Sequence, residues 1–302
     1  MDLTFLGTGG SVPTTKRNTV SIALRPGPEV LLFDCGEGTQ RQLMASSVSF
    51  MRISQIFISH HHGDHFLGLP GLIQSMNFYG RLVPLEIFGP EGTADLVNKM
   101  LGLGVFDRQY EVTGHDLRPG DKVGGDGHHV EAFRAAHTVP SLGYIYQEHD
   151  RPGRFDREKA LALGVKEGPD FSRLVNGETV RTEAAAVTPD MVLGPSRKGM
   201  RFVYSGDTAP CPEIFEACQG ADVLVHEATV TSDLELKARE FGHSTAKDAA
   251  TLARNAGVGT LYLVHISGRY EDAGPLLTEA IGIFPRTIIP NDLDSFILRS
   301  DK

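Results

Sequence analysis

The stretch His60-His61-His62-Gly63-Asp64-His65 comes directly after the apolar run Ile56-Phe57-Ile58. At the end of a strand, His60 and His62 project to the same side and can bind one metal ion, because strand side chains alternate. Asp64 and His65 follow as the chain turns at Gly63, and they can reach a second ion. Imidazole and carboxylate suit a borderline cation such as zinc. Because four of the twelve histidines fall within these six residues, a chance polar loop explains them poorly, and we expect a metal site.

Four ligands cannot complete two metal sites, so further ligands are expected at the ends of other strands. Three candidates each follow an apolar run of the kind that forms a strand, namely His137, Asp207 and His265. In open α/β folds, ligands bind beyond the carboxyl ends of the strands, where these side chains would lie. A single histidine at a strand end is more often a structural residue. The three candidates are informative because they occur together, in this order, after the cluster.

Short β-branched runs alternate with amphipathic stretches along almost the whole chain, a pattern that is typical of an α/β protein. The expected strands cover residues 3–6, 19–24, 30–33, 53–59, 85–88, 130–134, 142–146, 201–205, 223–225 and 261–265. The expected helices cover residues 38–45, 66–78, 93–100, 213–217, 245–255 and 275–283. The candidate ligands therefore lie in an alternating α/β arrangement.

The chain has 302 residues, of which 40% are hydrophobic and 22% are charged. This is an ordinary globular composition, so extended disorder, coiled-coil and collagen-like structures are excluded. No stretch approaches the ~18–20 apolar residues that cross a bilayer, and the first residues lack the features of a signal peptide. The three cysteines form no Cys-x-x-Cys pair, which argues against a cysteine-based zinc site and fits a reducing cytosol. We expect a cytoplasmic protein without a membrane segment.

Residues 151–198 differ in composition from the rest of the chain. They contain Gly168-Pro169, Asn176-Gly177 and similar turn-forming steps, with little sustained periodicity. The net charge is −9, but this segment has nine Lys and Arg against seven Asp and Glu, so it carries +2 and the remainder carries −11. Because strand-like runs continue on both sides, we interpret it as an excursion from one domain, and we expect a projecting arm rather than a packed element. A polyanion would have to bind at such a local patch.

Taken together, these motifs resemble the metallo-β-lactamase superfamily. The resemblance includes residues 5–11 (Phe-Leu-Gly-Thr-Gly-Gly-Ser) and residues 32–39 (Leu-Phe-Asp-Cys-Gly-Glu-Gly-Thr), besides the candidate ligands. Within the superfamily, the chain is most similar to the ribonuclease Z family of tRNA 3′-processing endonucleases. The features that carry this narrower resemblance are Pro13-Thr14-Thr15-Lys16-Arg17-Asn18, His226-Glu227-Ala228-Thr229, Gly242-His243-Ser244-Thr245 and the excursion with its Gly168-Pro169 step. The resemblance covers essentially the whole chain.

The resemblance implies a four-layer αβ/βα sandwich formed by a single domain over residues 1–302, with residues 151–198 as an inserted tRNA-binding arm. It also implies two zinc ions per chain at one edge of the sandwich. His60, His62 and His137 would bind the first zinc, Asp64, His65 and His265 would bind the second, and Asp207 would bridge the two.

The implied activity is that of a zinc-dependent endoribonuclease that removes the 3′ trailer from precursor tRNA, leaving a 3′-hydroxyl on the tRNA and a 5′-phosphate on the trailer. Two divalent ions lower the pKa of a shared water and neutralise the scissile phosphate. Asp64 is the candidate general base. His243 is the candidate proton donor to the leaving oxygen, with Glu227 orienting its ring, because an imidazole needs an acceptor to present the correct nitrogen. The competing interpretation is that His243 caps a helix and Glu227 is solvated.

Further contacts to precursor tRNA are expected from two regions. Lys16 and Arg17 are surface charges by default, but the resemblance implies that their loop lies near the 3′ end of the tRNA, so they are candidates for phosphate contacts. The arm at 151–198 would bind the body of the tRNA through its shape and phosphates. The resemblance also suggests a homodimer.

Two alternatives remain open from the sequence. A hydrolase of small molecules, acting on a phosphodiester, lactone, thioester or arylsulfate, would use the same metal ligands. The excursion and the motifs around Glu227 and His243 favour the nuclease over this alternative. A non-catalytic RNA-binding protein with an incomplete site is the second alternative, and the presence of all seven candidate ligands argues against it.

Overall fold

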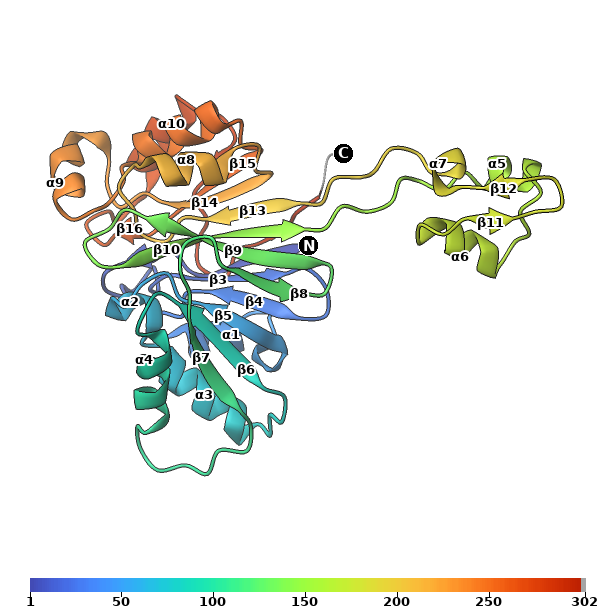
Figure 1. Cartoon of the computed structure of the whole chain (residues 1–302). Coiled ribbons are helices and arrows are strands. Elements are labelled where there is room, and N and C mark those ends of the chain that lie inside the picture. Colours follow the sequence, from blue (N-terminus) through green and yellow to red (C-terminus); the bar gives the residue numbers. More distant parts are fainter. Residues whose placement is uncertain (300–302) are drawn as a thin grey trace. The chain divides into compact units, whose positions relative to one another are not determined.

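The computed structural model describes residues 1–299 of the chain, which fall into two compact units. The first unit, called the body here, contains residues 1–147 and 201–299. The second, called the inserted unit, contains residues 148–200. Figure 1 shows both units and labels their helices and strands where there is room. The inserted unit contains the whole of the compositional break at residues 151–198.

The first sheet of the body has seven strands in the order β18-β1-β3-β4-β5-β6-β7. These strands are β1 (Asp2–Gly7), β3 (Ser21–Arg25), β4 (Val30–Phe33), β5 (Ile53–Phe57), β6 (Leu85–Gly89), β7 (Val112–Asp116) and β18 (Ser295–Ile297). The strands from β4 to β7 are parallel, and Ile56 of β5 lies opposite Leu32 and Ile87. Their carboxyl ends therefore meet at one edge of the sheet, where the stretch His60–His65 begins.

The second sheet also has seven strands, in the order β17-β15-β14-β13-β10-β9-β8. These strands are β8 (Lys122–Gly125), β9 (His128–Ala135), β10 (Ser141–Glu148), β13 (Arg201–Tyr204), β14 (Val223–Glu227), β15 (Thr260–Val264) and β17 (Thr287–Ile288). The strands β13, β14 and β15 are parallel, so the residues that follow them meet at one edge. A short parallel pair of β2 (Gly9–Gly10) and β16 (Ile266–Ser267) brings the loop after β1 beside the segment after β15.

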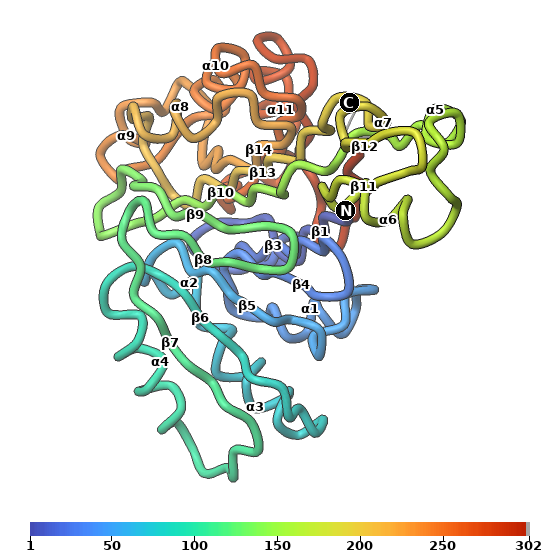
Figure 2. Tube along the Cα trace, turned by 45° about the vertical axis from the view of Figure 1, so that its right-hand side comes forward, coloured from blue at the N-terminus to red at the C-terminus, as the bar shows by residue number. Residues whose placement is uncertain are grey.

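Helices cover the outer faces of the two sheets, so the body has four layers (Figures 1 and 2). On the first sheet, α1 contacts β1 and α4 contacts β6 and β7, whereas on the second α10 contacts β14 and β15. The helices of the body are α1 (Thr39–Ala45), α2 (Gly63–Phe66), α3 (Leu69–Phe78), α4 (Thr93–Leu101), α8 (Pro212–Cys218), α9 (Glu235–Glu240), α10 (Ala246–Ala256) and α11 (Gly274–Ile281), with single 3-10 turns at η1 (Phe50–Arg52) and η2 (Ser232–Leu234). The predicted α/β sandwich is therefore confirmed.

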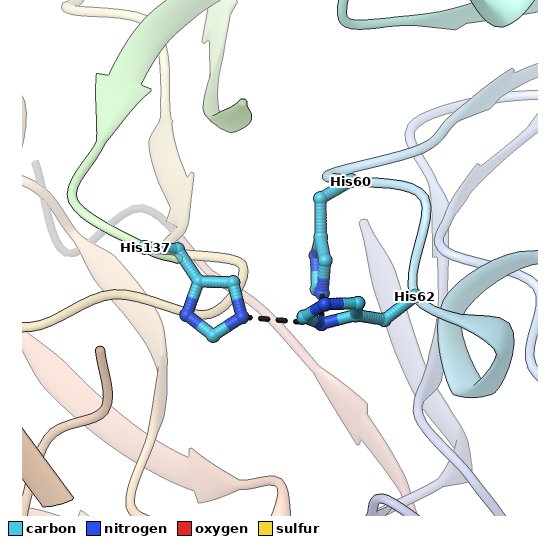
Figure 3. A group of neighbouring side chains, drawn as sticks. All are labelled: His60, His62 and His137. Atoms are coloured by element: carbon cyan, nitrogen blue, oxygen red, sulfur yellow. Dashed lines mark hydrogen bonds between the residues drawn. The ribbon is translucent and has the colours of Figure 1, made fainter. Parts of the chain in front are cut away.

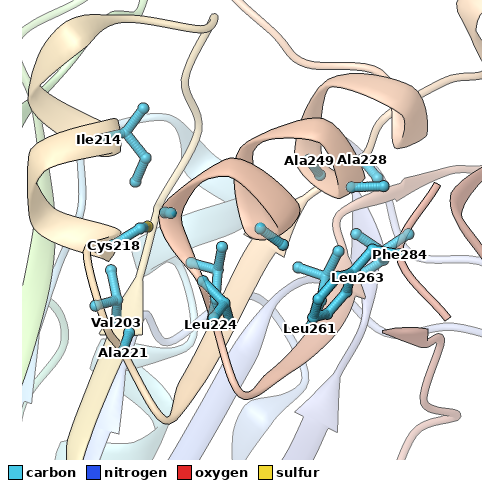
Figure 4. Packing of buried hydrophobic residues seen from close by; sticks show 14 of the residues in the cluster. Val203, Ile214, Cys218, Ala221, Leu224, Ala228, Ala249, Leu261, Leu263 and Phe284 are labelled. Carbon is cyan, nitrogen blue, oxygen red and sulfur yellow. The ribbon is translucent and has the colours of Figure 1, made fainter. Parts of the chain in front are cut away.

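Helix α10 shows how the sequence builds one outer layer. It begins with a capping box, in which the Thr245 side chain and the Asp248 side chain each accept a hydrogen bond from the other residue's backbone N–H, and it ends at Gly257 in the left-handed region. Its buried residues are all alanines, at positions 246, 249, 250, 253 and 256. These small side chains let the helix approach the sheet closely, and the residues that they cover include Leu224 and Leu261 (Figure 4).

Aromatic side chains fill the interior between the two sheets. The Phe33 ring lies 5.4 Å from the ring of Phe57 on the neighbouring strand and 5.3 Å from that of Phe202 on the second sheet, measured between centroids. The hydroxyl of the buried Tyr144 donates a hydrogen bond to the Ile58 carbonyl over 2.6 Å, so a residue of β10 is connected to the end of β5. This packing holds the strand ends of both sheets in a fixed relation.

Several elements of the body differ from the sequence-based expectations, and two of the differences have a local cause. The helix predicted over 66–78 begins at Leu69 as α3, whereas Phe66 ends the separate helix α2. The chain turns between them at Gly68, whose backbone N–H donates to the Cys35 carbonyl and where a Cβ atom would lie 2.2 Å from the Gly36 oxygen. Strand β7 was not predicted, because Gly114 interrupts its pattern and allows close packing against α4. Within residues 1–299, no helix is long and apolar enough to cross a membrane.

The inserted unit has packed elements of its own, which corrects the expectation that residues 151–198 would not form a packed element. They are α5 (Arg157–Ala162), α6 (Pro169–Val175), α7 (Pro189–Val192) and a β-ladder of β11 (Val180–Arg181) with β12 (Ala186–Val187). They enclose a small core of Ala160, Val165, Leu174, Val180, Val187 and Val192. Pro169 and Pro189, which we expected in turns, are the first residues of α6 and α7. Proline is tolerated at this position because a backbone N–H there would have no partner within the helix. These helices are too short to show a helical period in the sequence.

Candidate metal centre

The seven ligands predicted from the sequence lie together where strands of both sheets end. They come from the segments after four strands: His60 and His62 after β5, Asp64 and His65 in α2, His137 after β9, Asp207 after β13 and His265 after β15. Their possible ligand atoms form overlapping groups of three, and within each group these atoms lie within 4.8 Å of one another. The sandwich therefore collects residues that are up to 205 positions apart in the chain.

His60, His62 and His137 form the first group (Figure 3). Nδ1 of His62 lies 2.9 Å from Nε2 of His60 and 3.2 Å from Nε2 of His137. The other ring nitrogen of His137, Nδ1, donates a hydrogen bond to the Gly242 carbonyl over 2.9 Å. Because this hydrogen bond places the proton on Nδ1, the lone pair of Nε2 is directed at its two neighbours.

Asp64, His65 and His265 form the second group, and Asp207 lies between the two groups. Nε2 of His265 lies 3.3 Å from Oδ2 of Asp64 and 3.2 Å from Oδ2 of Asp207. The same Asp207 oxygen lies 3.9 Å from Nε2 of His60 in the first group. His265 has a positive φ of 58°, and Gly10 passes so close to its ring that a Cβ there would lie 2.5 Å from it. Such strain in a non-glycine residue is typical of functional sites.

The His65 ring is oriented by Asp34, a residue that our sequence analysis did not single out as a site residue. The Asp34 Oδ2 atom accepts a hydrogen bond from Nδ1 of His65 over 2.7 Å and another from the Tyr204 hydroxyl over 2.6 Å. Its Oδ1 atom accepts the backbone N–H of Ser59 over 2.6 Å. The sequence does contain a signal for Asp34. This carboxylate directly follows the apolar strand β4, just as the candidate ligands follow apolar strands.

The geometry of this group fits a bound metal. Nε2 of His65 is buried and has no hydrogen-bond partner among residues 1–299. It lies 3.3 Å from Oδ2 of Asp207 and 3.5 Å from Oδ2 of Asp64. A buried polar atom without a partner costs about 1–3 kcal/mol, and a cation bound between these atoms would satisfy it. Nitrogen and oxygen donors without sulfur suit a divalent transition metal.

The electrostatics of the centre favour positive charge. Burial opposes a charged His65, but the carboxylates of Asp207 and Asp34 outweigh burial and raise the pKa of His65 well above its ordinary value. Burial likewise opposes a charged Asp207, but the neighbouring His265 and His65 outweigh it and hold the pKa of Asp207 well below the ordinary value. A bound metal ion would displace the ring protons of these histidines. The affinity of the centre for metal should therefore fall at low pH.

His243 and Glu227 lie beside this centre. Nδ1 of His243 donates to Oε1 of Glu227 over 2.9 Å and lies 3.8 Å from Oδ2 of Asp207. The buried Glu227 carboxylate also accepts the backbone N–H of Thr208 and the hydroxyl of Thr229. Burial disfavours a charged His243, but Glu227 outweighs burial and raises the pKa of His243 to about 9. The ring is therefore oriented, and it can carry a proton at neutral pH.

Lys16 and Arg17 lie in a loop of the body that contacts the segment directly after His265. The Arg17 guanidinium donates to the Thr8 hydroxyl and, over 2.9 Å, to the Pro290 carbonyl, so it contributes to the fold. The Lys16 ammonium donates to the Glu271 carbonyl over 3.0 Å. A cavity of about 270 Å³ lies between this loop and residues 266–271, directly after His265. Both residues are thus near the predicted ligands, and neither is among them.

Comparison with known proteins identifies the family. Residues 180–266 match the model of the beta-lactamase superfamily domain, and residues 1–140 match that of the anti-Pycsar protein Apyc1. The chain is 48% identical to ribonuclease Z of Methanosarcina acetivorans, over 96% of each chain. It is 47% identical to ribonuclease Z of Methanothermobacter thermautotrophicus, over 97% of this chain and 95% of the relative.

Solved structures give the same result. The crystal structure of human tRNase Z, short form, matches with a TM-score of 0.73 and 28% identity, over 99% of this chain and 100% of that chain. The metallo-beta-lactamase fold protein YhfI from Bacillus subtilis matches with a TM-score of 0.71 but only 17% identity, so it supports the fold alone. Because sequence identity close to one half extends over nearly all of both chains, this protein belongs to the ribonuclease Z family.

Proposed function

We propose that this protein is a zinc-dependent endoribonuclease that removes the 3′ trailer from precursor tRNA, leaving a 3′-hydroxyl on the tRNA and a 5′-phosphate on the trailer. The observation that carries the proposal is the convergence of seven nitrogen and oxygen donors beside an imidazole–carboxylate pair, in a chain of this family. A small-molecule hydrolase would need the same donors, but the inserted unit gives the protein a second surface that a small substrate does not require.

Two zinc ions per chain fit the donor set. His60, His62 and His137 would hold one ion, Asp64, His65 and His265 would hold the other, and Oδ2 of Asp207 lies within reach of both groups. Bound divalent ions lower the pKa of a water and neutralise the charge of a scissile phosphate. Zinc is favoured because it accepts imidazole and carboxylate together, whereas magnesium and calcium prefer oxygen ligands.

Asp64 is proposed as the general base. Its Oδ2 atom accepts the backbone N–H of Ser11 over 2.7 Å and lies 3.3 Å from Nε2 of His265, so the carboxylate is held in one orientation. Its Oδ1 atom has no hydrogen bond to any residue among 1–299 and can take the proton of an attacking water. The residue would then serve both as a ligand and as a base.

His243 is proposed as the proton donor to the 3′ oxygen that leaves. The Glu227 carboxylate accepts from Nδ1 of the ring, which leaves Nε2 to present its proton to the substrate. The same carboxylate keeps the pKa of His243 above the neutral range, so the acid form is available. A positioned proton donor of this kind contributes about 10²- to 10⁴-fold to a rate.

The inserted unit is proposed to bind the tRNA body. Three of its arginines pair with carboxylates, as in the contacts of Arg173 with Asp170 and Glu178. The six other basic side chains are exposed and have no carboxylate partner within residues 1–299, namely Arg154, Lys159, Lys166, Arg181, Arg197 and Lys198. Lys166 and Arg181 line one cavity of about 480 Å³. Unpaired basic groups on a separate unit are suited to phosphate contacts with a folded RNA.

A homodimer in the cytoplasm is the proposed working form. Four apolar side chains at the end of α3 and in the following loop are exposed: Phe78 at 88%, Tyr79 at 59%, Leu82 at 76% and Val83 at 66%. Several exposed apolar side chains within one short segment are a candidate interface, and light scattering on the purified protein would show a dimer mass. The three cysteines are free thiols, which fits a reducing compartment.

The function is tested by incubating the purified protein with a labelled precursor tRNA and mapping the ends of both products. We expect one cleavage at the start of the trailer, with a 3′-hydroxyl on the tRNA and a 5′-phosphate on the released fragment. The control is the Asp64→Ala variant, which should not cleave. Hydrolysis of a nitrophenyl phosphodiester without cleavage of any precursor tRNA would favour the small-molecule hydrolase instead.

A further inference from the structure

A cavity of about 510 Å³ has the candidate ligand His137 among its lining residues. Three segments of the body line it: residues 90–91 between β6 and α4, residues 117–119 between β7 and β8, and residues 134–142 from the end of β9 to the start of β10. Its volume falls within the range of about 300–1,000 Å³ that is usual for ligand sites. None of the residues to which roles are assigned above lines this cavity, except His137.

Two arginines line the cavity, and their side chains are unpaired. Arg118 and Arg134 are both exposed, and neither guanidinium has a hydrogen bond or a salt bridge to any residue among 1–299. By contrast, Arg25 and Arg239 each pair with a carboxylate. In a chain with a net charge of −9, two free guanidinium groups on one cavity form a local positive site. A guanidinium binds a phosphate through two parallel hydrogen bonds, so this site is suited to a phosphate group.

The remaining wall of the cavity is mostly apolar. Its apolar residues include Pro90, Leu117, Pro119, Val139 and Pro140, beside the hydroxyl-bearing Thr138 and Ser141, and the side chain of Glu91 is the one acid among the described lining residues. An apolar surface beside a positive group matches the two halves of a nucleotide, which has a flat base and a charged phosphate. Enzymes that recognise single-stranded RNA use both halves in this way.

We propose that this cavity is a subsite for a ribonucleotide next to the scissile phosphate, with Arg118 and Arg134 binding its phosphate and the apolar wall covering its base. The position follows from His137, which lines the cavity and belongs to the first group of candidate ligands. The subsite rests on the proposed function, because it takes a nucleotide of the same RNA. That nucleotide belongs either to the end of the tRNA or to the trailer.

The test compares Arg118→Ala, Arg134→Ala and the double variant with the wild type. The matched control is Arg52→Ala, because Arg52 is exposed but lies before β5, whereas His60 follows the other end of that strand. For precursor tRNA we expect KM to rise about tenfold in the double variant, with metal content and hydrolysis of a nitrophenyl phosphodiester close to the wild type. The slope of log KM against log salt should fall by about 0.7 for each phosphate contact that is lost.

Two precursor tRNAs distinguish the sources of the nucleotide. If the arginines bind a trailer phosphate, the difference in KM between variant and wild type should disappear when the trailer is shortened to one nucleotide. If they bind the end of the tRNA, the difference should persist. Arg134→Lys, which keeps the charge, should recover part of the affinity.

The subsite is refuted if the double variant processes precursor tRNA with the wild-type KM, or if Arg52→Ala raises KM equally. An equal loss on the nitrophenyl phosphodiester would also refute it, because the effect would then be damage to the centre. The failure of the proposed function gives a different result, since the wild type itself would then not cleave precursor tRNA.

Discussion

Asp34 accepts a hydrogen bond from Nδ1 of His65 over 2.7 Å, and both side chains are completely buried. The contact joins the end of β4 to the short helix α2, and it determines which nitrogen of His65 carries the proton. Because Nδ1 donates this hydrogen bond, Nε2 is the nitrogen that would bind a metal between Asp64 and Asp207 once the metal displaces its proton. A carboxylate outside the predicted ligand set therefore orients one of the candidate ligands.

The first prediction follows from this contact. Asp34→Asn should lower the affinity for metal by about 10- to 100-fold, because an amide N–H facing Nδ1 would move the ring proton to Nε2 and remove the lone pair. The measurement is competition with a chromogenic chelator. Tyr204→Phe is the matched control, since it removes another hydrogen bond to Asp34 and leaves the His65 contact intact. Equal losses of affinity in the two variants would contradict the role of Asp34 in setting the tautomer.

The second prediction concerns metal content. The wild-type protein should retain about two zinc ions per chain after purification at neutral pH. His62→Ala and Asp207→Ala should each lower this number. His61→Ala is the control within the same motif, because His61 faces the Thr93 hydroxyl at 2.9 Å and belongs to none of the donor groups. Elemental analysis that finds one ion or none in active wild-type protein would exclude a two-metal site.

The third prediction separates proton donation from metal binding. His243→Ala should keep the metal content of the wild type but lower the rate on precursor tRNA by about 10² to 10⁴, the usual contribution of a positioned acid. A nitrophenyl phosphodiester has a good leaving group that hardly needs a proton, so its hydrolysis should change far less. Single-turnover rates on the two substrates measure this difference. If both rates fell by the same factor, His243 would not be the proton donor.

The fourth prediction concerns the inserted unit. Its two ends are adjacent, since the backbone N–H of Glu148 donates to the Met200 carbonyl over 2.9 Å, so a short Gly/Ser turn can replace residues 151–198. The shortened protein should keep its metals and its phosphodiesterase activity. Its KM for precursor tRNA should rise strongly, because binding and not chemistry is lost, and its salt dependence should be weaker than that of the wild type. An unchanged KM would show that this unit does not bind the tRNA.

The fifth prediction is a dependence of stability on pH. Burial opposes a charged Asp248, but hydrogen bonds from Arg239 and Thr245 outweigh it and lower the pKa of Asp248 from its ordinary value near 3.8. Because the folded state has the lower pKa, this carboxylate stabilises the protein above about pH 4 and loses that effect as the pH falls through the folded-state pKa.

Asp248→Asn should therefore lower the free energy of unfolding by about 1 kcal/mol at pH 7, with a smaller difference toward pH 3. Urea unfolding of the variant and the wild type between pH 3 and pH 7 measures this difference in the free energy of unfolding. The control is Glu235→Gln, which removes an exposed partner of the same Arg239 and should change stability by a few tenths of a kcal/mol. A difference for Asp248→Asn that did not depend on pH would contradict the assignment.

Local spacing made much of the centre predictable. His60 and His62 project to the same side because strand side chains alternate, and each distant candidate ligand follows an apolar strand. Such features depend on only a few neighbouring residues, so one sequence is enough to show them. The start of the helix predicted over 66–78 lies instead at Leu69, because it depends on the approach of residues 35–36 to Gly68, which no local pattern contains.

The sequence alone was sufficient for the α/β alternation, the motif at residues 60–65 and the residue types of the centre, because backbone geometry repeats every two or 3.6 residues. Only the tertiary structure decided that Asp34 orients His65 and that Arg118 and Arg134 share one cavity. These contacts depend on strand register and on how segments far apart in the chain meet, and their energy comes from packing between elements, so the composition of a single segment does not contain them.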